Sequence, residues 1–534
     1  MKKNTHSITI SLLFFVGLIG NLCASSKPNV LLIILDDLND FVGHMGGHPQ
    51  VITPNIDALA TQGVAFNNAH SNAAVCIPSR ASFMSGVSPI TSRFYGFGNE
   101  RKNETLIASK TLPELARENG YKTYTTGKVF HSARRDLWDD NGIAAEYGPV
   151  ASDGKNHTYH PEVPGDFSEF GVLDGTYISL AKVPIVTPSA FTSGYTGWRN
   201  IRSKAPFHYV SETDRDPMAD ERSAEWTVQK IRSLESQDQD DPFFMAVGFI
   251  RPHTPLVVPQ KYFDMYPLES VQLPIINKSD RADTRLEDDN NSRGRKIYHT
   301  LVDSYGGDRE LALRHYTQAY LASITFADEM VGQVMKAIDQ SKFRDNTVVI
   351  LTSDHGYHIG EKDFLFKYTI WEESTRVPFI IRHPGYQRQA GSIVEHPISL
   401  IDLFPTISDF CDWENLAPRK KSSGTIDGFS LKPFLEDPDL ISWDGPNSAL
   451  SIRASWMSQA IDRQHFSLRS RDFRYIKYNK PAGEASEELY DHRDDPHEWN
   501  NLAESPKYES VIQAMRRELA ERLTPAVKRQ SAKL

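Results

Sequence analysis

The sequence predicts an α/β protein: a large mixed, mostly parallel β-sheet covered by helices, with a smaller antiparallel sheet near the C-terminus. Short, continuous apolar runs such as NVLLIILDD alternate with helical patterns. Strands that are buried on both faces have such runs, and their alternation with helices is typical of parallel sheets. After Leu435, polar and apolar residues alternate between turn signals, which predicts the antiparallel sheet.

The first elements of the predicted main sheet lie before residue 130. NVLLIILDD, residues 29–37, is rich in β-branched residues and ends in two aspartates, as expected of a buried strand. TPNIDALATQGVAF predicts a short helix that ends at Gly63. TLPELARENGYKTYTTGKV predicts a helix, a stop at Gly120 and then a strand.

The later elements follow the same order. DPFFMAVGFIRPH, residues 241–253, and NTVVILTSDHG, residues 346–356, predict two more buried strands. Apolar residues recur at spacings of three and four from Tyr320 to Ile338, which predicts a helix over about 310–340. The polar stretch from about 276 to 300 predicts a surface loop, and residues 150–220 show no clear periodicity.

The N-terminus reads as a secretory signal, so we expect a signal peptide over 1–25, a main domain over 26–435 and a C-terminal subdomain over 436–534. Two lysines precede the apolar run ITISLLFFVGLIG, and small residues follow it in CASS. A structural N-terminal helix fits the lysines less well, and a lipid on Cys23 fits Leu22 poorly. No later stretch is long and apolar enough to span a bilayer. We therefore predict a periplasmic or secreted protein.

Composition excludes some classes of partner and scaffold. The formal net charge of −10 argues against general binding to nucleic acid or acidic membranes. Three cysteines in 534 residues cannot form a disulfide framework.

Polar clusters follow four of the predicted strands. They are Asp36-Asp37, Lys128 with His131, Arg251 with His253, and Asp354-His355. In open parallel sheets, ligands bind outside the carboxyl ends of the strands, so clusters that are distant in sequence can meet at one edge. A single cluster is readily explained as polar residues of a surface loop, whereas four together predict a functional site.

Three aspartates in these clusters predict a metal site. Asp36, Asp37 and Asp354 offer carboxylate oxygens, which repel one another unless a cation lies among them. Oxygen-rich ligation favours Ca²⁺ or Mg²⁺ over Zn²⁺. An adjacent pair of aspartates is weak evidence alone, but this pair directly follows a predicted buried strand.

Cys76, in AAVCIPSRASF, is the most unusual residue of the sequence. Pro78 suits the first turn of a helix and Gly86 suits its end, so Cys76 is predicted at a helix N-terminus, where free N–H groups attract an anion. It is open at this point whether Cys76 is a buried hydrophobe, a thiolate nucleophile or a residue that is chemically converted. A soft sulfur is a poor neighbour for an oxygen-preferring metal.

The C-x-P-S-R pattern with a short helix after it resembles the signature of the type I sulfatases. The resemblance extends from Asn29 to about Leu502 and includes NVLLIILDD, TSDHGYHIGEKDFLFKYTIWEESTRVP, DGFSLKPFL and ELYDHRDDPHEWNNLA. The sequence is most similar to the iduronate-2-sulfatase branch, through GKVFH, VGFIRPHTPLVVPQKYF and YPLESVQLP. The resemblance implies an alkaline-phosphatase-like fold with a catalytic domain over 26–435.

The resemblance also implies roles for residues at matching positions. Cys76 is expected to be converted to formylglycine by a maturation enzyme. One Ca²⁺ per chain is expected to be bound by Asp36, Asp37, Asp354, His355 and an oxygen of the modified Cys76. Arg80 is expected to hold the formylglycine hydrate, and His131 to contact its second hydroxyl. Lys128 and Lys367 are expected to contact sulfate oxygens, and His253 to protonate the leaving alcohol.

These roles agree with the chemistry of sulfate ester cleavage. Negative charge develops on the leaving oxygen, so a general acid helps, while a metal and two ammonium groups stabilise the transferring group. One hydroxyl of the hydrate attacks sulfur, and the second, deprotonated by His131, collapses to the aldehyde and expels sulfate. Serine or cysteine has no second hydroxyl and is expected to stall as a covalent intermediate.

The sequence thus predicts a Ca²⁺-dependent sulfatase that acts on a sulfated carbohydrate in polysaccharide degradation. The branch resemblance points to a 2-O-sulfated uronic acid or a similar sugar. One alternative is a phosphonate or phosphate ester hydrolase of the same superfamily. Another is a catalytically inactive, carbohydrate-binding relative, although a binding module has no need of a convertible cysteine.

Overall fold

The computed structural model describes residues 27–185, 196–237, 241–285, 292–419, 426–454, 460–479 and 485–531. The predicted signal peptide and Cys23 lie outside these residues. The strands of the main sheet are, in chain order, β1 (Asn29–Asp36), β2 (Val64–Phe66), β4 (Lys122–Gly127), β5 (Asp140–Ala144), β11 (Phe243–Pro252), β13 (Thr347–Ser353), β15 (Phe379–Arg382) and β16 (Ser392–Val394).

The main sheet is mixed and mostly parallel, as predicted. Its spatial order is β16-β2-β15-β13-β1-β11-β4-β5. β1 lies at the centre and pairs in parallel with β11 and β13, and β4 pairs in parallel with β11 and β5. Among these described strands, only β15 runs antiparallel to its neighbours, β13 and β2. The carboxyl ends of β13, β1, β11 and β4 therefore open on the same edge.

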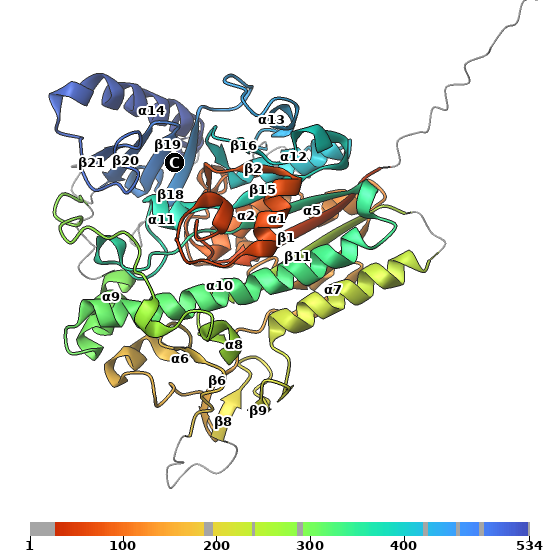
Figure 1. Cartoon of the computed structure of the whole chain (residues 1–534). Coiled ribbons are helices and arrows are strands. Elements are labelled where there is room, and N and C mark those ends of the chain that lie inside the picture. The colour runs from red at the N-terminus through yellow and green to blue at the C-terminus, as the bar shows by residue number, and fades with distance from the viewer. Residues whose placement is uncertain are drawn as a thin grey trace, which may run out of the picture.

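Helices cover both faces of this sheet (Figure 1). Those on one face are α1 (Pro54–Gln62), α7 (Ala219–Glu235) and α10 (Arg309–Asp339), and those on the other are α2 (Cys76–Ser85), α5 (Leu112–Glu118) and α12 (Leu403–Phe410). Successive side chains of a strand point to opposite faces. Accordingly, Leu31 and Ile33 of β1 pack in the first layer, while Val30 and Leu32 pack in the second.

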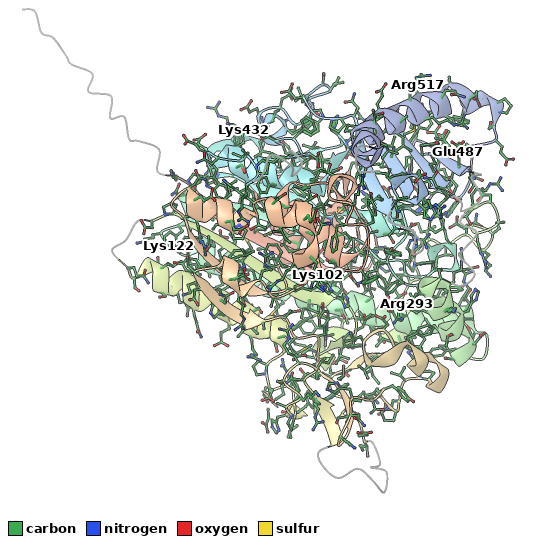
Figure 2. All side chains as sticks on the ribbon, turned by 180° about the vertical axis from the view of Figure 1, so that it is seen from behind. Lys102, Lys122, Arg293, Lys432, Glu487 and Arg517 are labelled. Atoms are coloured by element: carbon green, nitrogen blue, oxygen red, sulfur yellow. The ribbon has the colours of Figure 1, made fainter. Side chains whose placement is uncertain are left out.

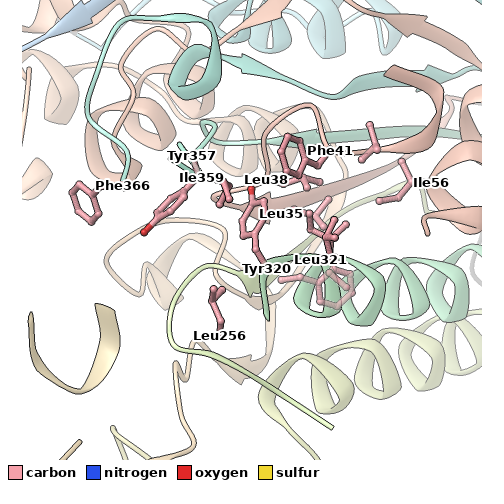
Figure 3. Close-up of a cluster of buried hydrophobic side chains, with 14 of the residues drawn as sticks. Leu35, Leu38, Phe41, Ile56, Leu256, Tyr320, Leu321, Tyr357, Ile359 and Phe366 are labelled. Carbon is pink, nitrogen blue, oxygen red and sulfur yellow. The ribbon is translucent and has the colours of Figure 1, made fainter. Parts of the chain in front are cut away.

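The long helix α10 confirms the prediction for about 310–340 and supports the end of β1. The carboxylate of Asp308 caps its first turn by accepting the N–H of Leu311 at 3.0 Å. Tyr320 points from this helix toward Leu35 and Leu38 (Figure 3). The Tyr320 hydroxyl donates to the carbonyl of Asp37 at 2.7 Å and accepts the N–H of Asn39 at 3.2 Å. The helix therefore holds the turn that carries Asp37.

The loop predicted over about 276–300 is only partly correct, because α9 (Arg293–Ser304) begins inside it. The buried face of α9 consists of Gly294, Arg295, Ile297, Tyr298 and Leu301, which recur at helical spacing. One of these residues is a charged arginine, Arg295, which is fully buried and donates to the carbonyl of Lys362. Because one position on the buried face is charged, the pattern of apolar residues did not predict this helix.

The C-terminal strands form the predicted antiparallel sheet. It consists of β18 (Ser448–Arg453), β19 (His465–Ser470), β20 (Phe473–Asn479) and β21 (Ala485–Asp491), and α14 (Glu509–Ser531) lies against it (Figure 1). Exposed charged side chains such as Lys102, Lys122 and Arg517 project outward around the molecule (Figure 2). Among the described residues, no helix is long and apolar enough to cross a bilayer.

A buried arginine joins the C-terminal sheet to the main domain. Arg474 of β20 is fully buried and pairs with the carboxylates of Glu372 and Glu498. It also donates to the carbonyl of Ile370 at 3.0 Å. Ile370 and Glu372 follow Lys367 closely in sequence, so this arginine ties the small sheet to the segment that carries a predicted site residue.

We expect Arg474→Met to destabilise the fold strongly. The substitution leaves two buried carboxylates without their common cation, which typically costs about 3–5 kcal/mol. The free energy of unfolding from denaturant titration measures this loss. Arg517→Gln, which replaces an exposed arginine on α14, is the matched control and should change the denaturant concentration at the unfolding midpoint little. Equal midpoints for both variants would contradict the assigned role of Arg474.

Candidate active site

Four strand ends bring the predicted site residues together. Asp36 ends β1 and Lys128 follows β4, while His253 and Asp354 follow β11 and β13. Helix α2 delivers Cys76 and Arg80 to the same place from the covering layer. The structure thus brings members of all four predicted clusters to one edge of the sheet, with the exception of Arg251.

A buried group of potential metal ligands lies at the centre. Ligand atoms of Asp36, Asp37, Cys76 and His355 all lie within 4.8 Å of one another. The Nδ1 of His355 lies 3.0 Å from the carbonyl oxygen of Gly356, so Nδ1 carries the proton and Nε2 faces the group. That Nε2 lies 3.2 Å from the Sγ of Cys76 and 3.4 Å from Oδ1 of Asp37.

Asp354 borders this group. Its Oδ1 lies 3.7 Å from Nε2 of His355 and accepts the N–H of Asp37 at 3.2 Å, while its Oδ2 accepts from Arg80 at 2.7 Å. Asp37 itself adopts a left-handed backbone conformation with φ of 65°. Such a conformation is unfavourable for most non-glycine residues and is often found at functional sites. The bonds from Asp354 and Tyr320 hold it in place.

Three cations surround the acidic group. Lys128 pairs with Asp36, and the guanidinium of Arg80 lies 3.4 Å from Asp36 as well as contacting Asp354. The Nζ of Lys367 lies 2.6 Å from Asp37 and 3.4 Å from the Sγ of Cys76. All three cations are buried, so they are not surface ion pairs screened by solvent.

The pKa values of the two aspartates differ although the residues are adjacent. Burial opposes ionisation of Asp36, but Lys128, His253 and Arg80 together hold its pKa well below the usual value. Burial dominates at Asp37 and raises its pKa to about 7 despite the charge of Lys367. Lys367 thus does not fully offset the burial of the Asp37 carboxylate, and a further cation beside it would favour its ionised form.

Cys76 is the first residue of α2, as predicted, and Gly86 follows the helix with φ of 67°. The hydroxyl of Ser79, one turn on, donates to the carbonyl of Asp354 at 2.5 Å and so ties the helix to the end of β13. Burial, reinforced by the charge of Asp36, raises the pKa of the Cys76 thiol. An unmodified Cys76 is therefore a protonated thiol at neutral pH and a weak nucleophile.

Two histidines border the group. The Nδ1 of His253 lies 2.6 Å from the carbonyl oxygen of Thr254, so its Nε2 faces Asp37 at 3.9 Å. Burial and the charge of Lys367 lower the pKa of His253 well below its usual value. His131 is accessible to solvent, but partial burial of its ring and the charge of Lys128 lower its pKa to about 4.

The sequence did not reveal Tyr147 or the role of Arg251. The ring of Tyr147 packs edge-on against His253 with centroids 5.0 Å apart, and Nζ of Lys128 lies 5.1 Å from its centroid. Arg251 does not join the acidic group, because its buried guanidinium donates to the carbonyls of Tyr147, His253 and Val257. Tyr147 lies just before the stretch 150–220, in a segment for which the sequence predicted no element, so only the structure places it.

We expect Tyr147 to position His253, and its ring to matter more than its hydroxyl. Edge-to-face aromatic pairs contribute about 0.5–1.5 kcal/mol, which corresponds to a loss of up to about tenfold in kcat for Tyr147→Leu. Tyr147→Phe keeps the ring and should retain most of kcat. Steady-state kinetics over a range of pH measures this loss. The leucine variant should also shift the limb of the pH–rate profile that is expected from the titration of His253. Equal losses for both variants would contradict a positioning role of the ring.

The family model described as Sulfatase matches residues 28–412. The chain belongs to the sulfatase family. A second model, N-sulphoglucosamine sulphohydrolase, C-terminal, matches residues 360–524. A protein of Formosa agariphila named sulfatase is 30% identical over 92% of this chain and 86% of its own length. Human iduronate 2-sulfatase is 29% identical over 76% of this chain and 68% of its own length.

Solved structures agree on the fold of this sulfatase. A 2-O GAG sulfatase has a TM-score of 0.64 at 22% identity and covers 95% of this chain and 94% of its own. A phosphonate monoester hydrolase of Agrobacterium radiobacter has a TM-score of 0.63 at 22% identity, with 94% and 96% covered. The alkaline-phosphatase-like α/β fold is therefore confirmed, and membership of the family makes the protein a sulfuric ester hydrolase.

Proposed function

We propose that this sulfatase hydrolyses sulfate esters of a carbohydrate through formylglycine made from Cys76, with Ca²⁺ at the acidic group. The observation that carries the proposal is the convergence of Asp37, His355 and Lys367 on the Sγ of Cys76 at a helix N-terminus. Helix N-termini favour negative charge, and an ammonium beside them reinforces that preference. A sulfate group bound there has its sulfur next to residue 76.

The residues fit a hard cation. Asp36, Asp37, Asp354 and His355 would hold it, with the oxygen that replaces Sγ of Cys76 as the remaining ligand. The Oδ1 of Asp36 is buried and accepts no hydrogen bond, so it is available to a metal. When bound, Ca²⁺ supplies positive charge to the sulfate oxygens and the nucleophile. Three carboxylates favour Ca²⁺ over soft metals, and conversion removes the one soft ligand.

The environment of Cys76 supports conversion over a thiolate mechanism. A catalytic thiolate needs a lowered pKa, whereas the pKa of Cys76 is raised. Formylglycine, as a hydrated aldehyde, supplies one hydroxyl as the nucleophile and a second hydroxyl whose deprotonation expels the bound sulfate. The raised thiol pKa thus disfavours the interpretation of Cys76 as an unmodified nucleophile.

The surrounding side chains have distinct tasks in the proposed reaction. Arg80 orients the modified residue, and Lys128 and Lys367 bind sulfate oxygens and balance their charge. Nε2 of His253 donates a proton to the leaving alcohol. A bound sulfate ester brings negative charge next to His253, which raises the pKa of its imidazole toward the value that a general acid requires. His131 accepts the proton from the second hydroxyl.

Relatives support a carbohydrate substrate. Iduronate 2-sulfatase of human and mouse, an ulvan-active sulfatase of Formosa agariphila and the 2-O GAG sulfatase structure all carry names of sulfated-saccharide enzymes. We therefore propose a 2-O-sulfated uronic acid or a similar sugar from a sulfated polysaccharide as the substrate. We further propose export to the periplasm or beyond, and maturation by a formylglycine-generating enzyme.

Two assays test the function together. Turnover of an aryl sulfate is compared with that of an aryl phosphate and a phosphonate monoester, and sulfate release is followed on a panel of sulfated oligosaccharides. We expect the sulfate ester to be preferred and at least one oligosaccharide to be desulfated. A strong phosphate or phosphonate preference would favour the alternative that the structural neighbour represents. No release by fully converted protein would exclude the carbohydrate substrate.

A further inference from the structure

A hollow at the edge of the sheet adjoins His131. It has a volume of about 40 Å³ and is lined by the end of β4, the loop after it, and β5. Three arginines line it, Arg134, Arg135 and Arg202, whereas no aspartate or glutamate of the described chain does. His131 belongs both to this lining and to the electrostatic surroundings of Lys128 and Asp36. The hollow therefore begins where the proposed sulfate site ends.

Two of these arginines form no ion pair within the described part of the chain. Arg135 and Arg202 are exposed, and neither forms an ion pair with any residue that the structure describes. Arg134 differs, because it lies 3.6 Å from Asp136 and packs over the ring of Phe130. Two guanidinium groups that line the same hollow are suited to an anion with two or more oxygens.

The backbones that carry both arginines are fixed. The carboxylate of Glu146 accepts the N–H of Ile201 at 2.9 Å and that of Arg202 at 2.8 Å. These backbone hydrogen bonds occupy the carboxylate. On the other side, Arg101 donates to the carbonyl of Ala133 at 2.8 Å, and Asn141 donates to that of Arg135 at 3.2 Å. The two arginines therefore line the hollow from two hydrogen-bonded segments that are distant in sequence.

We propose that this hollow, the arginine hollow, is a second anion subsite that binds a sulfate or carboxylate group on the sugar next to the one that is desulfated. The inference rests on the proposed carbohydrate function and adds the requirement for a polyanionic substrate. His131 and His253 both border the buried group, and His131 also lines the hollow. A chain that leaves past His131 brings its neighbouring sugar over Arg135 and Arg202.

Direct binding tests this subsite without turnover. Isothermal titration uses full-length Cys76→Ala protein and three disaccharides with the same 2-O-sulfated sugar, whose neighbouring sugar is neutral, carries a carboxylate or carries a sulfate. Arg135→Gln/Arg202→Gln is made in this background. The control pair, Arg232→Gln/Arg388→Gln, removes two exposed arginines elsewhere on the main domain. Thermal unfolding confirms that all variants are folded.

We expect the parent to prefer an anionic neighbour by about tenfold, and the hollow variant to lose that preference while the control pair keeps it. If the hollow variant loses affinity for the sulfated disaccharide, the hollow binds sulfate; if it loses affinity for the carboxylated one, the hollow binds a carboxylate. An unchanged preference in the hollow variant, or an equal loss in the control pair, overturns the subsite. Equal binding of all three disaccharides by the parent also overturns it and leaves the sulfatase proposal intact. If the parent binds none of them, both the carbohydrate substrate and the subsite are wrong, whereas aryl sulfate turnover tests the chemistry separately.

Discussion

Cys76→Ala is expected to lower kcat for an aryl sulfate by about 10³-fold or more, because it removes the nucleophile and leaves only binding and electrostatic stabilisation. Cys76 is buried at the start of α2, so alanine fits the site without new steric conflict. The free energy of unfolding should therefore change far less than the rate. Steady-state kinetics with matched thermal unfolding measures both quantities.

Cys76→Ser distinguishes the formylglycine mechanism from a simple hydroxyl nucleophile. Serine supplies one hydroxyl and has no second one to expel the sulfate from the ester that forms on it. The variant should therefore accumulate a covalent sulfo group, which mass spectrometry of the peptide detects. The wild-type peptide should instead lack the thiol sulfur. Full activity of Cys76→Ala, or an intact thiol in fully active protein, would contradict the mechanism.

Cys411→Ala is the matched control for both variants. Cys411 is also buried, but it packs in the second core layer among residues such as Trp413 and Phe410 rather than beside the acidic group. Its substitution should loosen packing locally and leave kcat close to the wild-type value. A comparable loss of rate in this variant would show that the effect of Cys76 is a general consequence of core disruption.

Removal of Ca²⁺ is expected to have the second-largest effect. Chelation leaves Asp36, Asp37 and Asp354 close together, with burial already raising the pKa of Asp37 to about 7. We expect kcat to fall by at least about 10²-fold, since positive charge at the transferring group is lost. Rebinding at about 100 times the Kd should restore activity and stabilise the fold by about 2.7 kcal/mol.

The measurement is dialysis against a chelator followed by stepwise addition of Ca²⁺, with activity and unfolding temperature recorded at each step. Mg²⁺ added in parallel compares the two hard cations that the ligands favour. Asp354→Asn should weaken Ca²⁺ binding, whereas Glu269→Gln, which replaces an exposed acid on the surface, should leave it unchanged. Full activity in protein shown to be metal-free would exclude a catalytic cation.

Local patterns were sufficient for the sheet and the acidic group. The buried strands β1, β11 and β13 are continuous apolar runs, and burial on both faces requires that pattern. Asp36, His253 and Asp354 each end or follow such a run, so the shared polarity of parallel strands brings them to one edge. The N-terminal position of Cys76 on α2 likewise follows from Pro78 and Gly86.

Tertiary structure decided what depends on contacts between distant segments. Helix α9 was hidden because its buried Arg295 donates to the carbonyls of Lys362 and Asp363, which are far along the chain. Tyr147 and Arg251 act through packing and backbone contacts that leave no periodic signal. Arg202 and Arg135 are distant in sequence and line the same hollow, and Glu146 accepts the backbone N–H of Arg202. The sequence by itself thus determined which reactive residues gather at the edge of the sheet, whereas long-range packing determined how they are held and what surrounds them.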